Sequence, residues 1–141
     1  HPKTPWLQGR FKAFIDATLT YQHNSGTWYQ VTDLGSREGN YLEASGTAML
    51  TYAMAKGASL KFLPEEYKAH AEKGFAGLLD QMISVNPETN VISLEQVCAV
   101  AGLGGNPYRD GSFDYYMSEP IRANDAKGVG PFILAAHYLN K

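Results

Sequence analysis

The order of helical segments constrains the fold of this chain most strongly, because two helical patterns alternate along it. Residues 4–21 and 64–85 gather apolar side chains on one face, whereas residues 45–56 and 130–139 are apolar nearly all round. A helix with one apolar stripe packs its stripe on a core, and a helix that is apolar all round is buried. The order amphipathic, buried, amphipathic, buried predicts an all-α fold with an outer and an inner helical layer.

Capping residues set the expected helix ends. The first helix is expected to open at Thr4 and Pro5, because proline is favoured in a first helical turn. Ser45 is the expected cap of the second helix, which Gly57 would end. Pro64 opens the third helix, which is expected to end near Val85. Residues 86–127 read as a long irregular stretch, in which residues 91–100 are candidates for short strands.

The lengths of the connections predict where a pocket lies. Residues 22–44 and 86–127 form long connections from outer to inner helices, and residues 57–63 form a short return. Both long connections should therefore lie at one end, together with the N-termini of the buried helices. Helix N-termini favour negative charge, so a carboxylate-bearing ligand would suit a pocket there.

The number of helices predicts an incomplete structure. About four helices cannot close a ring of two layers, so apolar flanks of the buried helices would remain exposed. We expect residues 1–141 to be a single domain that forms part of something larger, or that self-associates or pairs with a partner chain through these flanks. The chain begins at His1 without a methionine or a signal-like segment, as a processed or truncated product would.

Composition excludes several classes of protein. The net charge of −2 means that the chain lacks the excess of basic residues typical of proteins that bind nucleic acid. No apolar run approaches the ~20 residues of a membrane span. Cys98 is the single cysteine, which excludes an internal disulfide and favours a small buried residue. The four histidines lack metal-ligand spacing, so no metal is expected.

The segment from Trp28 to Ser45 is the first candidate for a pocket wall. It carries Asp33, Arg37 and Glu43 in a loop broken by glycines, directly before the buried helix. Paired carboxylates here would suit acid–base chemistry on a sugar, but loops also carry acidic residues for capping and turns. Glu43 fits the role of a helix-dipole partner as well as that of a catalyst.

The second long loop offers further candidates. Asp110, Asp114, Glu119 and Asp125 lie in it, together with Arg109. Arg37 and Arg109 could each hold a carboxylate through a bidentate pair, or could each tie one loop to another.

Two long segments resemble glycoside hydrolase family 105, the unsaturated rhamnogalacturonyl hydrolases. They are WYQVTDLGSREGNYLEASGTAMLTYAMAKG, which starts at Trp28, and VCAVAGLGGNPYRDGSFDYYMSEPIRANDAKGVGPFILAA, which starts at Val97. The resemblance covers nearly all of residues 6–139 and is to the C-terminal part of the family. It implies an incomplete (α/α)6 barrel, to which this chain would supply about four of twelve helices.

The resemblance also implies a reaction. The family acts on pectin-derived oligosaccharides that end in a 4,5-unsaturated uronic acid. An aspartic acid protonates C4 of the double bond, water adds at C5, and the hemiketal collapses to release the sugar. One acid–base group suffices for this hydration, and no cofactor or metal is implied.

The sequence departs from the family pattern at the catalytic acid. That aspartate, and a neighbouring FW-x-R-G-N-G-W segment, belong to the N-terminal half of the family and are absent here, so no catalytic residue is assigned and the isolated chain is expected to be inactive. The alternative is a non-catalytic carbohydrate-binding or structural helical module that pairs with a partner chain. The compartment stays open between the cytoplasm and the periplasm of a bacterium. The expected substrate-binding residues are Trp28, Gln30, Asp33, Arg37 and Glu43, followed by Tyr108 and Arg109.

Overall fold

The computed structural model describes residues 1–141 and contains five α-helices and four short strands. The helices are α1 (Thr4–Leu19), α2 (Ala44–Ser59), α3 (Tyr67–Gln81), α4 (Phe113–Ser118) and α5 (Ala126–Leu139). The strands are β1 (Ile83–Val85), β2 (Ile92–Leu94), β3 (Val97–Cys98) and β4 (Ile121–Arg122), and a 3-10 turn spans Thr32–Leu34. The predicted helical class is confirmed, as is the prediction of short strands between residues 91 and 100.

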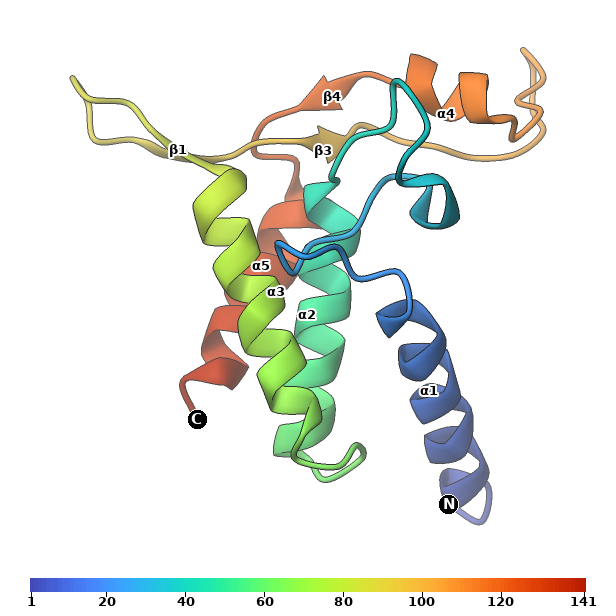
Figure 1. The fold of residues 1–141 in the computed structure, drawn as a ribbon, viewed down its shortest axis with the longest axis vertical. Coiled ribbons are helices and arrows are strands. Elements are labelled where there is room, and N and C mark those ends of the chain that lie inside the picture. The colour runs from blue at the N-terminus through green and yellow to red at the C-terminus, as the bar shows by residue number, and fades with distance from the viewer.

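Helices α2, α3 and α5 form the body of the molecule, and α1 stands beside them (Figure 1). One core cluster joins α1 to the body through Ile15, Trp28 and Met54, and includes Leu63 and Tyr67 at the start of α3. A second cluster lies nearer the strands and consists of the buried residues Ala44, Ala48, Leu78, Met82, Leu94 and Val97. Helix α2 contributes to both clusters, so it is the central element of the chain.

Helices α1 and α5 leave large apolar side chains exposed. In α1 only Ile15 is buried, and Leu7 and Phe14 of the expected inner stripe are 56% and 57% exposed. In α5 only Gly128 and Ala135 are buried, whereas Ile133 is 59% exposed. The expected inner stripe of α1 is therefore wrong within this chain, because no element of residues 1–141 covers Leu7 and Phe14. The exposed flank of α5 agrees with the expectation that about four helices leave the flanks of the buried helices uncovered.

Several helix ends differ from the expected ones because tertiary contacts decide them. Gly57 does not stop α2 but lies buried inside it, where an added Cβ would come within 2.8 Å of Leu63 Cδ1. Helix α3 ends at Gln81, since Ile83–Val85 pairs with Ile92–Leu94 as an antiparallel hairpin. Helix α5 begins four residues earlier than expected, because the Asp125 side chain accepts a hydrogen bond from the Lys127 N–H (3.1 Å) and caps it.

The second long connection contains more structure than expected. Strands β3 and β4 pair antiparallel, with Val97 opposite Arg122 and Cys98 opposite Ile121. Between them α4 begins where the Ser112 side chain accepts a hydrogen bond from the Tyr115 N–H. The strand pair and α4 lie above the N-terminal ends of α2 and α5 in Figure 1. None of the helices combines the length and the apolar character needed to cross a bilayer.

Candidate functional site

The two long loops meet at one end of the helical body, as predicted. The Tyr29–Leu42 bridge closes the first loop on itself. The Ala44 N–H then donates to the Gln96 carbonyl (2.9 Å), which joins the first loop to the strand segment of the second. In Figure 1 the second loop and the later part of the first loop lie at the upper end, away from the turn between α2 and α3, whereas the start of the first loop crosses α2 and α3 lower down.

Glu43 holds this junction together. Its side chain is 5% exposed and accepts hydrogen bonds from the Gly46 N–H (2.6 Å), the Ser45 hydroxyl (2.7 Å) and the Cys98 N–H (2.9 Å). Both carboxylate oxygens are therefore used within the chain. The expected substrate contact at Glu43 is wrong: the residue caps α2, as the dipole alternative proposed, in place of the expected cap Ser45.

The same geometry corrects the expected anion pocket. The carboxylate of Glu43 occupies the N-terminus of α2, and that of Asp125 occupies the N-terminus of α5. Hydrogen bonds from the Lys127 backbone and side chain lower the pKa of Asp125 below its usual value, so this cap stays ionised. The partial positive charges of both helix ends are thus matched by the chain itself.

Trp28 is part of the core and not part of a binding surface. Its side chain is 1% exposed, and its indole N–H donates to the Thr18 carbonyl at the end of α1 (2.8 Å). Its backbone N–H donates to Thr47 Oγ1 (3.0 Å) in α2. The expected stacking of a sugar on Trp28 is wrong, because neither ring face is open.

Gln30 lies half-buried beneath the junction. Its amide N–H donates to Cys98 Sγ (3.3 Å), and Cys98 is a buried free thiol, as the sequence predicts. Burial, followed by the neighbouring Cys98, raises the pKa of the Tyr41 phenol above its ordinary value. Gln30 and Tyr41 of the first loop thus meet Cys98 of the second, and Gln30 remains only partly available to a ligand.

Arg37 bridges the rims of the two loops. Its guanidinium lies over the Phe113 ring, 3.8 Å from the ring centroid, and its Nη2 is 3.5 Å from Asp114 Oδ1. Arg37 is half exposed and Asp114 almost wholly exposed, so this ion pair is weak and the remaining N–H donors are open to solvent. Asp33 is also exposed, in the 3-10 turn of the same loop.

Arg109 and Tyr108 occupy the tip of the second loop. The Arg109 side chain donates to the Gly104 carbonyl (2.8 Å) and the Leu103 carbonyl (3.3 Å), so it holds the loop together. Tyr108, which is 77% exposed, projects from the loop that Arg109 fixes. These contacts lie within the second loop, so the expected tie from Arg109 to the other loop is not among them.

Two residues that the sequence reasoning did not single out shape this end. Phe113 supplies the face on which Arg37 lies, and the Tyr115 hydroxyl accepts a hydrogen bond from the Gly102 N–H (3.1 Å). A hydrogen bond with Glu119 raises the pKa of Tyr115. The Asp-Gly-Ser turn that precedes an aromatic run was the available signal, because serine after a turn favours a helix start.

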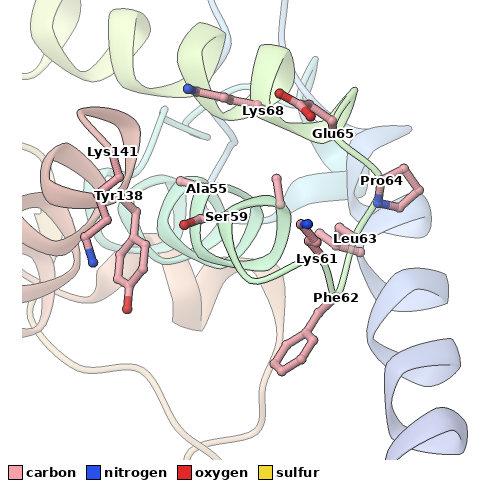
Figure 2. A pocket seen from close by; sticks show the side chains of 11 residues that line it. Ala55, Ser59, Lys61, Phe62, Leu63, Pro64, Glu65, Lys68, Tyr138 and Lys141 are labelled. Atoms are coloured by element: carbon pink, nitrogen blue, oxygen red, sulfur yellow. The ribbon is translucent and has the colours of Figure 1, made fainter.

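A concave surface lies at the other end of the body. A cleft of about 650 Å³ opens between the C-terminal ends of α2 and α5 and the turn into α3 (Figure 2). None of the expected substrate-binding residues lines it. No group of three or more His, Cys, Asp or Glu side chains is arranged to hold a metal ion.

This chain is similar to solved structures of family 105 glycoside hydrolases and of possible members of that family. A solved glycoside hydrolase of family 105 from C. acetobutylicum is 48% identical, with a TM-score of 0.85 over 89% of this chain and 35% of that one. A possible family 105 member from Salmonella enterica has a TM-score of 0.74 at 24% identity over 96% of this chain and 32% of that one, which shows the shared fold.

The curated relatives are also longer than this chain. Protein Atu3128 of Agrobacterium fabrum and a 24.9 kDa protein in the picA locus of Rhizobium radiobacter are each 40% identical over 138 residues, 94% of this chain. The chain spans 59% of the length of each. The family model for Glycosyl Hydrolase Family 88 matches residues 1–141. The resemblance to family 105 is thereby confirmed, and the chain belongs to glycosyl hydrolase family 88 as a part of the family's helical fold.

Proposed function

We propose that this chain is part of a glycosidase that hydrates the 4,5-double bond of a terminal unsaturated uronic acid on pectin-derived oligosaccharides of the rhamnogalacturonan type. The observation that carries the proposal is the meeting of the two long loops at one end, in a chain 48% identical to a family 105 glycoside hydrolase. At this end of the helices, the first loop exposes Arg37 and the second exposes Tyr108, and both side chains are suited to contact an acidic sugar.

Arg37 is the proposed partner of the uronate carboxylate. Stacking on Phe113 holds the guanidinium in one orientation, and most of its donors are free of protein partners. A planar guanidinium pairs with a carboxylate through two parallel hydrogen bonds, so the substrate would compete with the weakly held Asp114. Asp33 and Gln30 are proposed to bind hydroxyl groups, and Tyr108 to contact a sugar face.

The proton donor is proposed to lie outside residues 1–141. A general acid needs a pKa near the working pH. In this second loop, hydrogen bonds from Ser112 lower the pKa of Asp110, and Lys127 lowers that of Asp125. Both remain ionised at neutral pH and cannot supply a proton to C4. Because the family's catalytic aspartate belongs to a segment that residues 1–141 do not match, the isolated chain is proposed to be inactive.

The chain is further proposed to supply two outer helices, α1 and α3, and two inner helices, α2 and α5, of an (α/α)6 barrel. Support comes from the exposed apolar side chains Leu7 and Phe14 on α1 and Ile133 and Leu134 on α5. Additional helices on those flanks would bury them and would bring the missing acid to the loop end.

A chimera tests the proposal. Residues 1–141 would replace the matching third of the C. acetobutylicum family 105 protein, and turnover of an unsaturated galacturonyl-rhamnose disaccharide would be followed by loss of its ultraviolet absorbance. We expect turnover by the parent protein and the chimera, and none by the 141-residue chain. Arg37→Ala in the chimera is expected to lower kcat/KM about 10-fold or more, as loss of a charged hydrogen-bond partner does.

The matched control is Arg122→Ala, which removes an exposed arginine of the second loop that lies outside the proposed contacts. Turnover by the isolated chain would contradict the proposal that the proton donor lies outside residues 1–141. A folded chimera without turnover, beside an active parent, would contradict the proposed function.

A further inference from the structure

The cleft away from the loops has a composition unlike that of the loop end. Three lysines line it: Lys61 from the turn after α2, Lys68 from α3 and Lys141 at the end of α5. Figure 2 shows Lys68 on one side, Lys141 on another and Lys61 near the centre, around the end of α2. The ammonium groups therefore surround the cleft from three segments of the chain.

The rest of the lining is a mixture of hydroxyl, carboxylate and apolar groups. Ser59 and Tyr138 bring hydroxyls, Glu65 brings a carboxylate, and Ala55 and Leu63 are among the apolar residues. Lys141 Nζ lies over the Tyr138 ring, 4.6 Å from its centroid. This contact places one ammonium beside the ring on the α5 side.

This lining selects among anionic ligands. Lysines attract carboxylates as point charges, whereas Glu65 repels a plain polyanion and accepts hydrogen bonds from hydroxyl groups. Phe62, which also lines the cleft and is 47% exposed, offers an apolar surface suited to the C–H faces of sugar rings. A ligand that carries carboxylates, hydroxyls and apolar ring faces together matches all three kinds of group.

The distribution of charge supports this assignment. Between residues 28 and 45, Asp33, Glu38 and Glu43 are balanced by Arg37 alone, and the whole chain has a net charge of −2. The cleft, with three lysines and one glutamate, is a local excess of positive charge. An acidic saccharide would therefore meet an attractive potential here.

We propose that this cleft is an accessory binding site for oligosaccharides that contain uronic acids. The choice of saccharide rests on the proposed function, because a hydrolase of acidic oligosaccharides encounters such chains. The accessory site holds saturated uronate residues and takes no part in the hydration. It lies at the opposite end of the helices from the proposed substrate loops.

A titration of the full 141-residue chain with saturated trigalacturonate tests the proposal. We expect amide NMR shifts that cluster at residues 55–68 and 138–141. Binding should weaken as salt is raised, because exposed charges separated by more than about 10 Å are screened at 0.1 M ionic strength. Neutral maltotriose at the same concentration is expected to bind at least several-fold more weakly.

Charge-removing variants provide the second arm. Each of Lys61→Gln, Lys68→Gln and Lys141→Gln is expected to weaken trigalacturonate binding about two- to five-fold, as exposed ion pairs do. The matched control is Lys73→Gln, which removes an exposed lysine of the same helix as Lys68 that does not line the cleft. All four substitutions affect surface side chains, so folding should be retained.

Three outcomes would overturn the accessory site: equal loss of binding in Lys73→Gln, shifts confined to the loops, or tighter binding of triglutamate, which would identify an acidic peptide site. The result is separable from the proposed function. If the chimera turns over the unsaturated disaccharide and trigalacturonate does not bind in the cleft, only the accessory site is contradicted. If trigalacturonate binds in the cleft and the chimera is inactive, only the proposed hydration activity is contradicted.

Discussion

Glu43 is the residue on which the junction of the two loops depends. Its carboxylate accepts hydrogen bonds from Gly46, Ser45 and Cys98, and the Cys98 donor is a backbone N–H buried in the second loop. Glu43→Ala removes a helix cap and leaves a buried donor without a partner. We expect the free energy of unfolding to fall by about 2–4 kcal/mol, measured by urea denaturation.

Glu38→Ala is the control for this prediction, since it removes an exposed carboxylate from the same loop. It should change the unfolding free energy by no more than about 0.5 kcal/mol. Equal urea midpoints for the two variants would contradict the structural role of Glu43.

The contrast between Trp28 and Arg37 explains what the sequence could predict at single residues. Both lie in an irregular loop, where no period of 2 or 3.6 tells which side chains point inward. Trp28 enters the core because Thr18 and Thr47 supply partners from helices distant in sequence, and those contacts are invisible in the loop itself. Arg37 lies at the rim beside Phe113, a partner 76 positions further on.

At the scale of elements, glycines fix how closely the helices approach one another. Gly77 of α3 is buried, and an added Cβ would clash with the Ser25 carbonyl and lie 2.8 Å from Thr27 Cγ2. Because the obstacle is backbone, Gly77→Ala is expected to destabilise the chain by about 1–3 kcal/mol, despite the higher helix propensity of alanine.

Gly9→Ala in α1 is the matched substitution, because nothing lies within 4 Å of its added Cβ. It should raise the unfolding free energy by about 0.5–1 kcal/mol. Thermal or urea unfolding of each variant measures its change in the free energy of unfolding. Changes of the same sign would show that helix propensity, and not the close approach of α3 to the first loop, decides the effect.

The helices themselves were predictable because their signals are local and repeated. Apolar periodicity located all four long helices, and an apolar pattern over several turns outweighs individual exceptions. Their ends were not predictable from local sequence. Gly57 lies inside α2, where an added Cβ would come within 2.8 Å of Leu63 Cδ1, and Ile83 pairs with Leu94 in a strand after α3 ends. Helix α4 was missed because a six-residue helix has too few turns to show a period.

At the scale of the whole molecule, the chain leaves helix faces uncovered that its sequence marks as buried. Ile133 is 59% exposed and Leu134 41% exposed on α5, and Met49 is 43% exposed on α2. A sequence pattern reflects the burial of a helix in the whole folded protein. The match to the C. acetobutylicum family 105 structure covers 35% of that chain. The difference between expected and observed burial supports the proposal that further helices cover these faces.

These uncovered faces predict self-association of the isolated chain. Ile133 and Leu134 are neighbouring exposed apolar residues of α5, so burying them between copies is favourable. We expect the weight-average mass in sedimentation experiments to rise with concentration. Ile133→Glu and Leu134→Glu should each shift the chain toward the monomer, because they place a charge in the contact.

Ile92→Glu is the control, since Ile92 is 65% exposed on the β1–β2 hairpin, away from the flank of α5. It should leave the association unchanged. A chain that stays monomeric at every concentration, or that Ile92→Glu dissociates equally well, would exclude the α5 flank as the contact. Fusion of the chain into the family 105 chimera should also abolish association, because the added helices would then cover the same face.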